Sequence, residues 1–234
     1  MHISPQKLKE KKVTFVVKEL HNRFAFKCQK CSNCCSMTKL LIYPFDIINL
    51  CEKLRITSEE FHKKYTYFVF DDNGIARCML RTNPACAFND KVCTVYEARP
   101  LRCMMFPVGR MYKGGKAVYM LPDAGCAGFR SGKKQSIEQW IREIPQELHT
   151  FSAQWSKFLS RLKKSGLPLK DKLFAMFFIK IFYDFDNELV YREVPQFREL
   201  STKEKMQAMY ELAEKYLFHF EEIKKGLEKI GKFE

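Results

Sequence analysis

Long apolar runs are missing from this chain of 234 residues. The longest, LFAMFFIKIFY at residues 173–183, is interrupted by Lys180 and falls well short of the roughly 20 residues that a membrane-spanning helix needs. The opening residues, MHISPQKLKEKK, have no apolar stretch beside their positive charges, so they do not resemble a secretory signal. We therefore expect a cytoplasmic protein with no membrane partner, and a core helix at residues 173–183.

Several catalytic signatures are absent as well. No glycine-rich loop joins a strand to a helix, as a nucleotide-phosphate site would require. The C-x3-C-x2-C spacing of radical S-adenosylmethionine enzymes fails because Thr38 stands at the third position after Cys31 and Cys35. No C-x-x-C pair precedes a helix in a βαβ pattern, which disfavours a thiol-disulfide catalyst. No residue receives a catalytic or organic-cofactor role, and whether the protein is an enzyme stays open.

Acidic residues are outnumbered by basic ones, 27 against 41, so the formal net charge is +14. The excess is concentrated in residues 1–35 and in KFLSRLKKSGLPLKDK at residues 157–172. Such a charge suits an anionic partner, including nucleic acid, but no basic nucleic-acid motif accompanies it. Solvated faces that keep the protein soluble are the favoured interpretation.

Local signals predict a mainly α protein with small β-hairpins, an α+β fold. Capping boxes, in which serine or threonine precedes glutamate or glutamine by three residues, predict helix starts at Thr57, Ser136 and Ser201. Asp46 is a candidate N-cap, which we favour over a catalytic role. Pro168 is suited to the first turn of the helix through residues 173–183.

Two turns and one long helix complete this prediction. Asn73-Gly74 and Gly114-Gly115 each separate two runs that can form strands, which is typical of hairpins. Over residues 203–230, apolar side chains recur every three or four positions and predict one long amphipathic helix. Without a repeat or linker, we expect a single domain, residues 1–234, in which a metal-centred cysteine region (residues 24–130) packs on a helical region (residues 135–234).

The ten cysteines are confined to residues 28–126. In FKCQKCSNCCSM, the residues Cys28, Cys31 and Cys34 show the C-x2-C-x2-C spacing that also occurs in ferredoxins. Cys35 follows directly, and because neighbouring side chains diverge, it suits a second metal or an outer thiol better than the same ion. In a reducing compartment this spacing indicates metal ligands rather than disulfides.

A second group of cysteines could complete the sites that the first begins. The segment PACAFNDKVCTVYEARPLRCMMFP contains Cys86, Cys93 and Cys103, which are too far apart to bind one ion on their own. Cys126 lies near Gly125 and Gly128, which permit close backbone approach. The two groups supply eight thiolates, enough for two four-coordinate sites, although the count does not decide between one centre and two.

These motifs resemble a known family. CQKCSNCC, YPFDI at residues 43–47, the second segment and Cys126 are together similar to the YkgJ-type cysteine-cluster family, a zinc- or iron-chelating CxxCxxCC domain. The resemblance spans about residues 24–130 and implies that eight cysteines bind metal: Cys28, Cys31, Cys34, Cys35, Cys86, Cys93, Cys103 and Cys126. A related family, the flagellin lysine N-methylases, suggests protein-lysine methylation by analogy.

Residues near the cysteines have supporting roles in this interpretation. In YEARP we expect Arg99 to donate hydrogen bonds around the metal, and Phe106 and Pro107 to exclude water. Cys51 lies on the apolar face of its helix, and we expect it to be a buried free thiol. Cys78 is evenly balanced between a core thiol and an extra ligand.

The leading hypothesis is a cysteine-ligated iron-sulfur centre, of the 4Fe-4S type, that serves redox chemistry or a methylase-like modifying activity on a protein partner. The C-x2-C-x2-C run and the excess of thiolates favour iron-sulfur, while the lack of histidines at ligand spacing fits iron-sulfur and zinc equally. The alternative is a structural zinc module that presents a basic surface to nucleic acid or a protein.

Overall fold

The computed structural model describes residues 15–29, 35, 40–82, 85–113, 115–122 and 127–229. The chain divides into two compact units, which we describe separately. Unit 1 joins residues 1–29 to residues 105–143, and unit 2 joins residues 30–104 to residues 144–234. The cysteine-rich region is therefore shared between the units, and the single domain stays a prediction.

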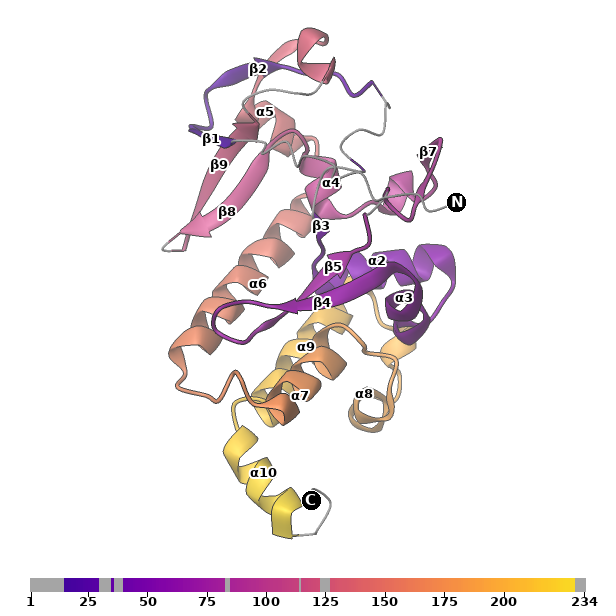
Figure 1. Cartoon of the computed structure of the whole chain (residues 1–234), viewed down its shortest axis with the longest axis vertical. Coiled ribbons are helices and arrows are strands. Elements are labelled where there is room, and N and C mark those ends of the chain that lie inside the picture. Colours follow the sequence, from indigo (N-terminus) through magenta and orange to yellow (C-terminus); the bar gives the residue numbers. More distant parts are fainter. Residues whose placement is uncertain are drawn as a thin grey trace, which may run out of the picture. The chain divides into compact units, whose positions relative to one another are not determined.

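The α+β class is confirmed in the described residues, which form helices and small antiparallel sheets (Figure 1). The helices are α2 (Pro44–Leu54), α3 (Ser58–Tyr65), α4 (Leu101–Met105), α5 (Ile137–Arg142), α6 (Gln146–Lys164), α7 (Lys172–Phe182), α8 (Glu188–Glu193), α9 (Thr202–Tyr216), α10 (Phe220–Lys229) and the 3-10 helices η1 (Tyr96–Ala98), η2 (Ala127–Arg130) and η3 (Phe197–Glu199). The strands are β1 (Phe15–Lys18), β2 (Arg23–Ala25), β3 (Leu40–Leu41), β4 (Thr66–Phe70), β5 (Ala76–Leu80), β6 (Asn89–Asp90), β7 (Val92–Cys93), β8 (Gly109–Lys113), β9 (Lys116–Pro122) and β10 (Lys134–Ser136).

Unit 1 contains a three-stranded antiparallel sheet in the order β1-β9-β8 and the pair β10-β2. The hairpin that Gly114-Gly115 predicts is confirmed as β8 and β9, with Gly115 at φ +79°. Behind β2, the rings of Phe24 and Phe26 meet Trp140 of α5 edge to face at 5.8 and 5.6 Å. The indole Nε1 of Trp140 donates to the carbonyl of Met105 at 2.9 Å, so this half-buried polar group is satisfied.

Unit 2 has a second antiparallel sheet, in the order β3-β5-β4. Its hairpin turns at the predicted Asn73-Gly74, where Gly74 adopts φ +88°, and a Cβ there would come within 2.8 Å of the carbonyl oxygen of Leu169. Helix α3 contacts β4, and α7 contacts β5, as Figure 1 shows around the violet hairpin. The hydroxyl of Tyr183, fully buried, donates to the carbonyl of Ala76 at 3.4 Å.

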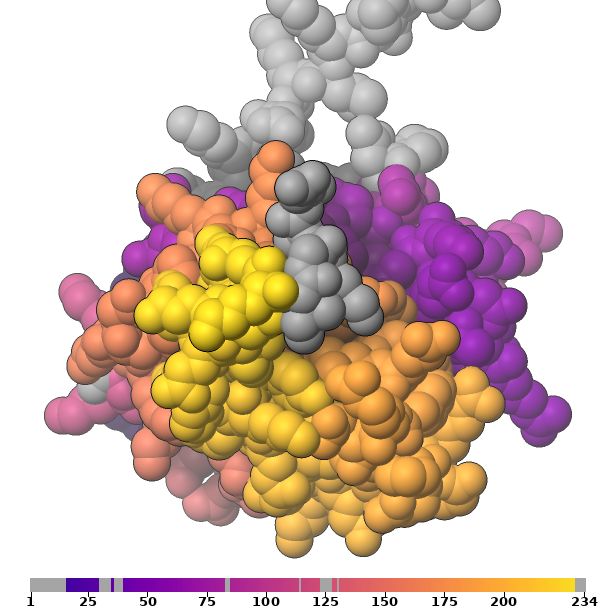
Figure 2. Space-filling view, turned by 90° about the horizontal axis from the view of Figure 1, so that it is seen from below, coloured from indigo at the N-terminus to yellow at the C-terminus, as the bar shows by residue number. Residues whose placement is uncertain are grey.

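The core of unit 2 is aromatic. Trp155 of α6 lies 4.9 Å from Phe182 and 5.9 Å from Phe178 of α7, measured between ring centroids, and all three side chains are buried. This confirms the core helix expected at residues 173–183. In Figure 2, orange and yellow helices from α7 to α10 cover much of the face seen from the α10 end. Truncating one such ring to alanine costs about 3–5 kcal/mol of stability.

Local capping signals were confirmed at all three predicted helix starts. Thr57, Ser136 and Ser201 are the N-caps of α3, α5 and α9, each in a reciprocal capping box. Pro168, by contrast, was wrongly placed in the first turn of α7. That helix begins at Lys172, because the carboxylate of Asp171 accepts hydrogen bonds from the N–H groups of Leu173 and Phe174 and acts as its cap.

The single long helix over residues 203–230 was also wrong. Helix α9 ends at Tyr216 and α10 begins at Phe220, while the N–H groups of Leu217 and Phe218 both donate to the carbonyl of Ala213. The break lets the ring of Phe218 reach Phe158 at 6.2 Å while Leu217 and Phe220 remain fully buried. Tertiary packing therefore overrides the helical periodicity at this point.

In the part of the chain that the structure describes, no helix combines the length and apolar character needed to cross a membrane.

Candidate metal centre

Helix α2 is the platform of the cysteine-rich part of unit 2. It begins with Pro44 at the first helical position, and its N-cap is Tyr43. The prediction that Asp46 is the N-cap was wrong, because Asp46 is the third helical residue. Its carboxylate accepts from the N–H of Tyr43 at 2.8 Å and from the N–H of Leu101 at 2.9 Å. Asp46 thus ties α2 to the start of α4, which carries Cys103.

The environment of Asp46 explains why it needs both partners. Only 2% of the residue is exposed, and burial raises the pKa of its carboxyl to about 7, while the N–H groups of Tyr43 and Leu101 and the charge of Arg102 oppose that rise. A buried carboxylate is stable only when its oxygens are hydrogen-bonded. Both carboxylate oxygens accept hydrogen bonds from the backbone, so Asp46 holds the segments of Tyr43 and Leu101 in position. This geometry supports the structural role that we favoured for Asp46 over a catalytic one.

The YEARP segment is anchored to α2 by a second contact. Glu97 lies 3.0 Å from Lys53 of α2, in an ion pair whose glutamate is 85% exposed and which therefore adds little stability. The guanidinium of Arg99 lies over the ring of Tyr96, 4.1 Å from its centroid. Hydrogen bonding of Arg99 around a metal stays a prediction, and its guanidinium is held by this cation–π contact.

A tight hairpin brings Cys86 and Cys93 together. Strands β6 and β7 pair so that Asn89 lies opposite Cys93, with Lys91 at φ +59° in the turn. The N–H of Asn89 donates to the carbonyl of Cys86 at 2.9 Å, which closes the chain in front of the hairpin. The six residues between Cys86 and Cys93 look too many for two ligands of one ion, but the hairpin turns this segment back towards Cys86. The turn-forming pair Asn89-Asp90 is the sequence signal that would have revealed this.

Four of the proposed ligands in unit 2 lie close enough to shift one another's pKa. We call these four residues the unit 2 cysteines: Cys35, Cys86, Cys93 and Cys103. The N–H of Cys86 donates to the carbonyl of Cys35 at 2.9 Å. Burial raises the pKa of Cys86, and the charges of Cys35 and Cys93 add to the rise, while the N–H of Phe88 opposes it. These four residues are separated by up to 68 positions in the chain, yet they influence one another electrostatically.

Cys103 is the most perturbed of these thiols. Burial raises its pKa well above the ordinary value, and the charges of Asp46, Cys86, Cys35 and Cys93 raise it further. Thiols that repel one another as thiolates are held protonated until a cation neutralises them. A metal ion or cluster supplies that positive charge, so the chemistry of the donor set fits the metals that thiolates bind.

The other predicted ligands are not part of this group in the described residues. Cys28 lies in unit 1, and Cys31, Cys34 and Cys126 lie outside the residues that the structure describes. No cluster of three or more His, Cys, Asp or Glu side chains with metal-binding geometry occurs in the described part of the chain. The metal-centred arrangement of the cysteine-rich region therefore stays a prediction.

Cys28 follows a stretch of unit 1 that is closely paired with η2. The N–H of Lys27 donates to the carbonyl of Gly128 at 3.1 Å, and the amide of Gln29 donates to the hydroxyl of Ser131 at 2.8 Å. A Cβ on Gly128 would lie 2.4 Å from the ring of Phe26, so only glycine permits this approach. The support expected of Gly125 and Gly128 for Cys126 stays a prediction, because Gly125 and Cys126 lie outside the described residues.

The remaining predictions concern the two cysteines outside the motif and two apolar residues. Cys51 is buried as expected, and Cys78 is fully buried, with its Sγ 3.9 Å from Nδ1 of His62. Burial raises the pKa of Cys78 to about 12, so it is a neutral core thiol. Phe106 packs edge to face on Phe26 at 5.7 Å within unit 1, and whether it covers a metal is untested.

Comparisons with known proteins agree with the motif. Residues 27–127 match a family model, CxxCxxCC, whose description is "Putative zinc- or iron-chelating domain", which confirms the family resemblance. A curated protein of Methanocaldococcus jannaschii, "Uncharacterized protein MJ0939", is 28% identical over 133 residues, which are 53% of this chain and 44% of that protein. The chain thus spans less than half of that relative. No solved structure matches.

Proposed function

Because residues 27–127 match the CxxCxxCC family, we propose that this protein binds metal through cysteine thiolates and that the unit 2 cysteines belong to the centre. The observation that carries the proposal is the hydrogen bond from the N–H of Cys86 to the carbonyl of Cys35, which links the first cysteine motif to the second. Cys28, Cys31, Cys34 and Cys126 complete the proposed set of eight ligands.

The proposed centre is an iron-sulfur cluster rather than zinc. The C-x2-C-x2-C run at Cys28, Cys31 and Cys34 is the ligand spacing of cubane clusters. The N–H of Phe88 donates to the sulfur of Cys86, and hydrogen bonds of this kind tune the reduction potential of such clusters.

The role proposed for the centre is redox chemistry. An iron-sulfur cluster, when bound, accepts and returns one electron. The chain's own contribution is to hold the thiolates with α2 and the β6-β7 hairpin and to keep Cys103 half-buried, which limits its access to solvent. Service to a protein-modifying reaction of the methylase type is the more distant form of this proposal and rests on the resemblance alone.

The decisive experiment is purification without oxygen, followed by measurement of iron, acid-labile sulfide and zinc per chain together with the visible spectrum. We expect about four iron and four sulfide per chain and an absorption band that a reductant bleaches. One or two zinc ions without colour would replace this proposal by a structural zinc module. A protein that contains neither metal after reconstitution would contradict metal binding.

Single substitutions test the ligand set. Replacing Cys86, Cys93 or Cys103 by serine should lower the metal content per chain by at least about half, because each is proposed as a direct ligand. Cys51→Ala is the matched control, since Cys51 is a buried thiol of the same unit that lies outside the motif. Equal metal content in Cys103→Ser and Cys51→Ala would remove Cys103 from the set.

A further inference from the structure

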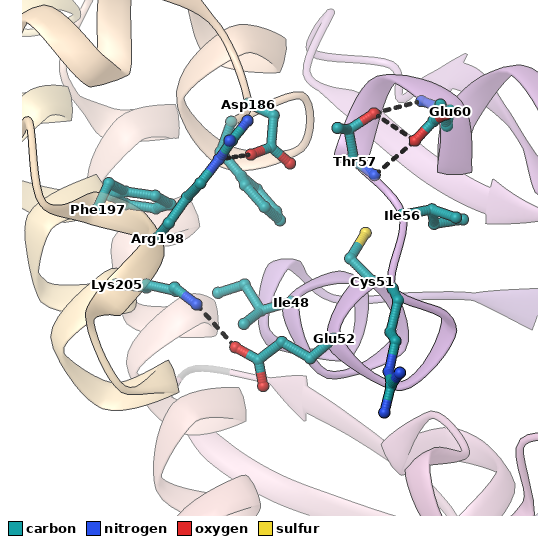
Figure 3. Close-up of a pocket in the computed structure, with 12 residues that line it drawn as sticks. Ile48, Cys51, Glu52, Ile56, Thr57, Glu60, Asp186, Phe197, Arg198 and Lys205 are labelled. Atoms are coloured by element: carbon teal, nitrogen blue, oxygen red, sulfur yellow. Dashed lines mark hydrogen bonds and ion pairs between the residues drawn. The ribbon is translucent and has the colours of Figure 1, made fainter.

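Unit 2 contains a cavity of about 300 Å³ that neither the cysteine motif nor the family accounts for. It is bounded by the second half of α2, the turn into α3, the segment after α7, η3 and α9 (Figure 3). All of these elements belong to the same unit. Its volume is at the lower end of the range for small-molecule sites.

The walls of this cavity are tied together, so it is preformed. On one side, Ser58 and Asp186 exchange two hydrogen bonds, from the N–H of Ser58 to the carboxylate at 2.7 Å and from the N–H of Asp186 to the hydroxyl at 2.9 Å. On the other side, Lys205 of α9 donates to Glu52 of α2 at 2.7 Å (Figure 3). A ligand would therefore enter a site that needs little ordering.

Two cations at the cavity have donors to spare. Lys205 is only 6% exposed, and its ammonium group, with three N–H donors, has the single acceptor Glu52 among the described residues. Arg198 donates from Nε to the hydroxyl of Tyr191 at 2.6 Å and forms an ion pair with Asp186 at 3.5 Å, and within the described chain its two terminal NH2 groups have no acceptor. Spare donors are costly at Lys205, which is buried, whereas the side chain of Arg198 is 64% exposed and reaches solvent. An anionic group beside Lys205 is therefore favoured, and Arg198 can add a second charge-assisted hydrogen bond to it.

The carboxylate of Glu52 has a free oxygen. Glu52 engages Lys205 through Oε1, and no group in the described residues donates to Oε2. Asp186 uses both carboxylate oxygens on protein groups, and Glu60 uses its Oε2 on the N–H and hydroxyl of Thr57. We choose Glu52 as the acceptor for an ammonium group of a ligand because it lies directly beside Lys205, the buried cation of the cavity.

The lining charges cancel, and the rest of the wall is apolar. Three basic residues (Arg55, Arg198 and Lys205) face three acidic ones (Glu52, Glu60 and Asp186). Ile48, Phe185 and Phe197 supply apolar surface, and the sulfur of Cys51 faces the cavity in Figure 3. The cavity thus has no net charge, but it offers spare N–H donors on two cations and a free carboxylate oxygen on Glu52. Such a site suits a ligand that carries one positive and one negative group.

From these contacts we propose that the cavity binds a small zwitterion, an α-amino acid with an apolar side chain. The ligand's carboxylate is held by Lys205 and Arg198, its ammonium group by Glu52, and its side chain by the apolar wall around Ile48 and Phe197. This site is independent of the metal proposed for the cysteines, and the two proposals can fail separately.

Calorimetric titration of the full-length protein, as purified with its metal, tests the ligand class. The probes are L-leucine, 4-methylpentanoate, which lacks the ammonium group, and 3-methylbutylamine, which lacks the carboxylate, each up to about 10 mM. We expect leucine to bind at least about tenfold more tightly than either analogue, because each analogue leaves a charged group of the site unpaired. No binding of leucine, or equal binding of all three probes, would overturn the proposal.

Variants assign the binding to this cavity. Lys205→Met and Arg198→Gln should each weaken leucine binding at least about tenfold, while Glu52→Gln should weaken leucine and leave 4-methylpentanoate unchanged. Lys203→Met, an exposed lysine on the same helix, is the control. Because the side chain of Arg198 is 64% exposed, Arg198→Gln should fold, and its leucine affinity can be measured even if Lys205→Met does not fold. Unchanged leucine affinity in Arg198→Gln would contradict the assignment.

Discussion

Asp46 shows how one side chain can join two motifs that are separate in the sequence. Its carboxylate holds Tyr43, before α2, and Leu101, at the start of α4, and the residue is almost completely buried. A hydrogen bond that involves a charged group contributes about 1.5–3 kcal/mol. The position of Cys103 relative to α2 therefore depends on Asp46, a residue 57 positions away that is not among the proposed ligands.

Replacing Asp46 by alanine should lower the free energy of unfolding by about 2–4 kcal/mol, because it leaves two backbone N–H groups without their acceptor. Asp46→Asn, which keeps one acceptor oxygen, should cost less. The measurement is urea unfolding followed by far-UV circular dichroism. Asp72→Ala, at an exposed position in the β4-β5 turn, is the control and should change stability by less than about 0.5 kcal/mol. Equal midpoints for Asp46→Ala and Asp72→Ala would contradict this role.

At the scale of the element, α7 and α10 are linked through the N-cap of α7. Asp171 caps the helix and also accepts from Lys224 of α10 at 2.7 Å. The hydrogen bond from Lys224 lowers the pKa of Asp171, and the N–H groups of Leu173 and Phe174 lower it further, while burial opposes them. A carboxyl whose pKa is lower in the folded than in the unfolded state stabilises the fold above the unfolded value.

Asp171→Ala should therefore cost about 1–2 kcal/mol at pH 7, and this cost should shrink as the pH falls below about 4 and through the lower folded pKa. Urea unfolding of both proteins at pH 7, 5 and 3 measures the difference. Lys224→Met, which removes the ion pair and keeps the cap, should lose only part of the stability. A difference that stays constant down to pH 3 would rule out the ionised cap.

Helix α10 offers a test of backbone propensity. Gly226 lies inside the helix with an ordinary φ, and a Cβ there would meet no atom within 4 Å. Gly226→Ala should thus raise the unfolding free energy by about 0.5–1 kcal/mol. The matched control is Gly166→Ala, which has equal space but φ +73°, and should destabilise instead. Thermal unfolding of both variants measures the change in stability. If the two substitutions change it in the same direction, Gly226 does not lie in a helix or Gly166 does not have a positive φ.

At the scale of the whole molecule, unit 2 has packing contacts that do not involve the proposed ligand cysteines. The rings of Phe45 in α2 and Phe151 in α6 lie 5.6 Å apart, and Thr202 of α9 donates to Asn49 of α2 at 3.0 Å. The segment with α2 and the C-terminal helices are thus held by apolar packing and hydrogen bonds across the unit. A metal centre built on this support would stabilise the cysteine loops more than the helices.

Removal of the metal should consequently leave most of the helical signal in place. After chelation, we expect far-UV circular dichroism at 222 nm to keep more than about three quarters of its amplitude, unlike zinc fingers, which unfold without metal. Metal content measured on the same sample confirms that removal is complete. Loss of more than about half of the helical amplitude would show that the centre holds the core together.

Structural features that depend only on neighbouring residues could be predicted from the sequence. The capping boxes at Thr57, Ser136 and Ser201, and the Asn73-Gly74 turn, appear where predicted because each satisfies backbone groups or a positive φ with its immediate neighbours. The cysteine spacing likewise identified the family, because ligands for one metal often come from one short segment.

Tertiary structure alone decided the features that join distant segments. The break between α9 and α10, the double role of Asp46 and the cavity between Glu52 and Lys205 each depend on partners more than 50 residues apart in the chain. Periodicity and spacing describe only the local geometry of a segment. Which buried polar groups find partners, and where a helix must break to bury its rings, follow from the surface it packs against.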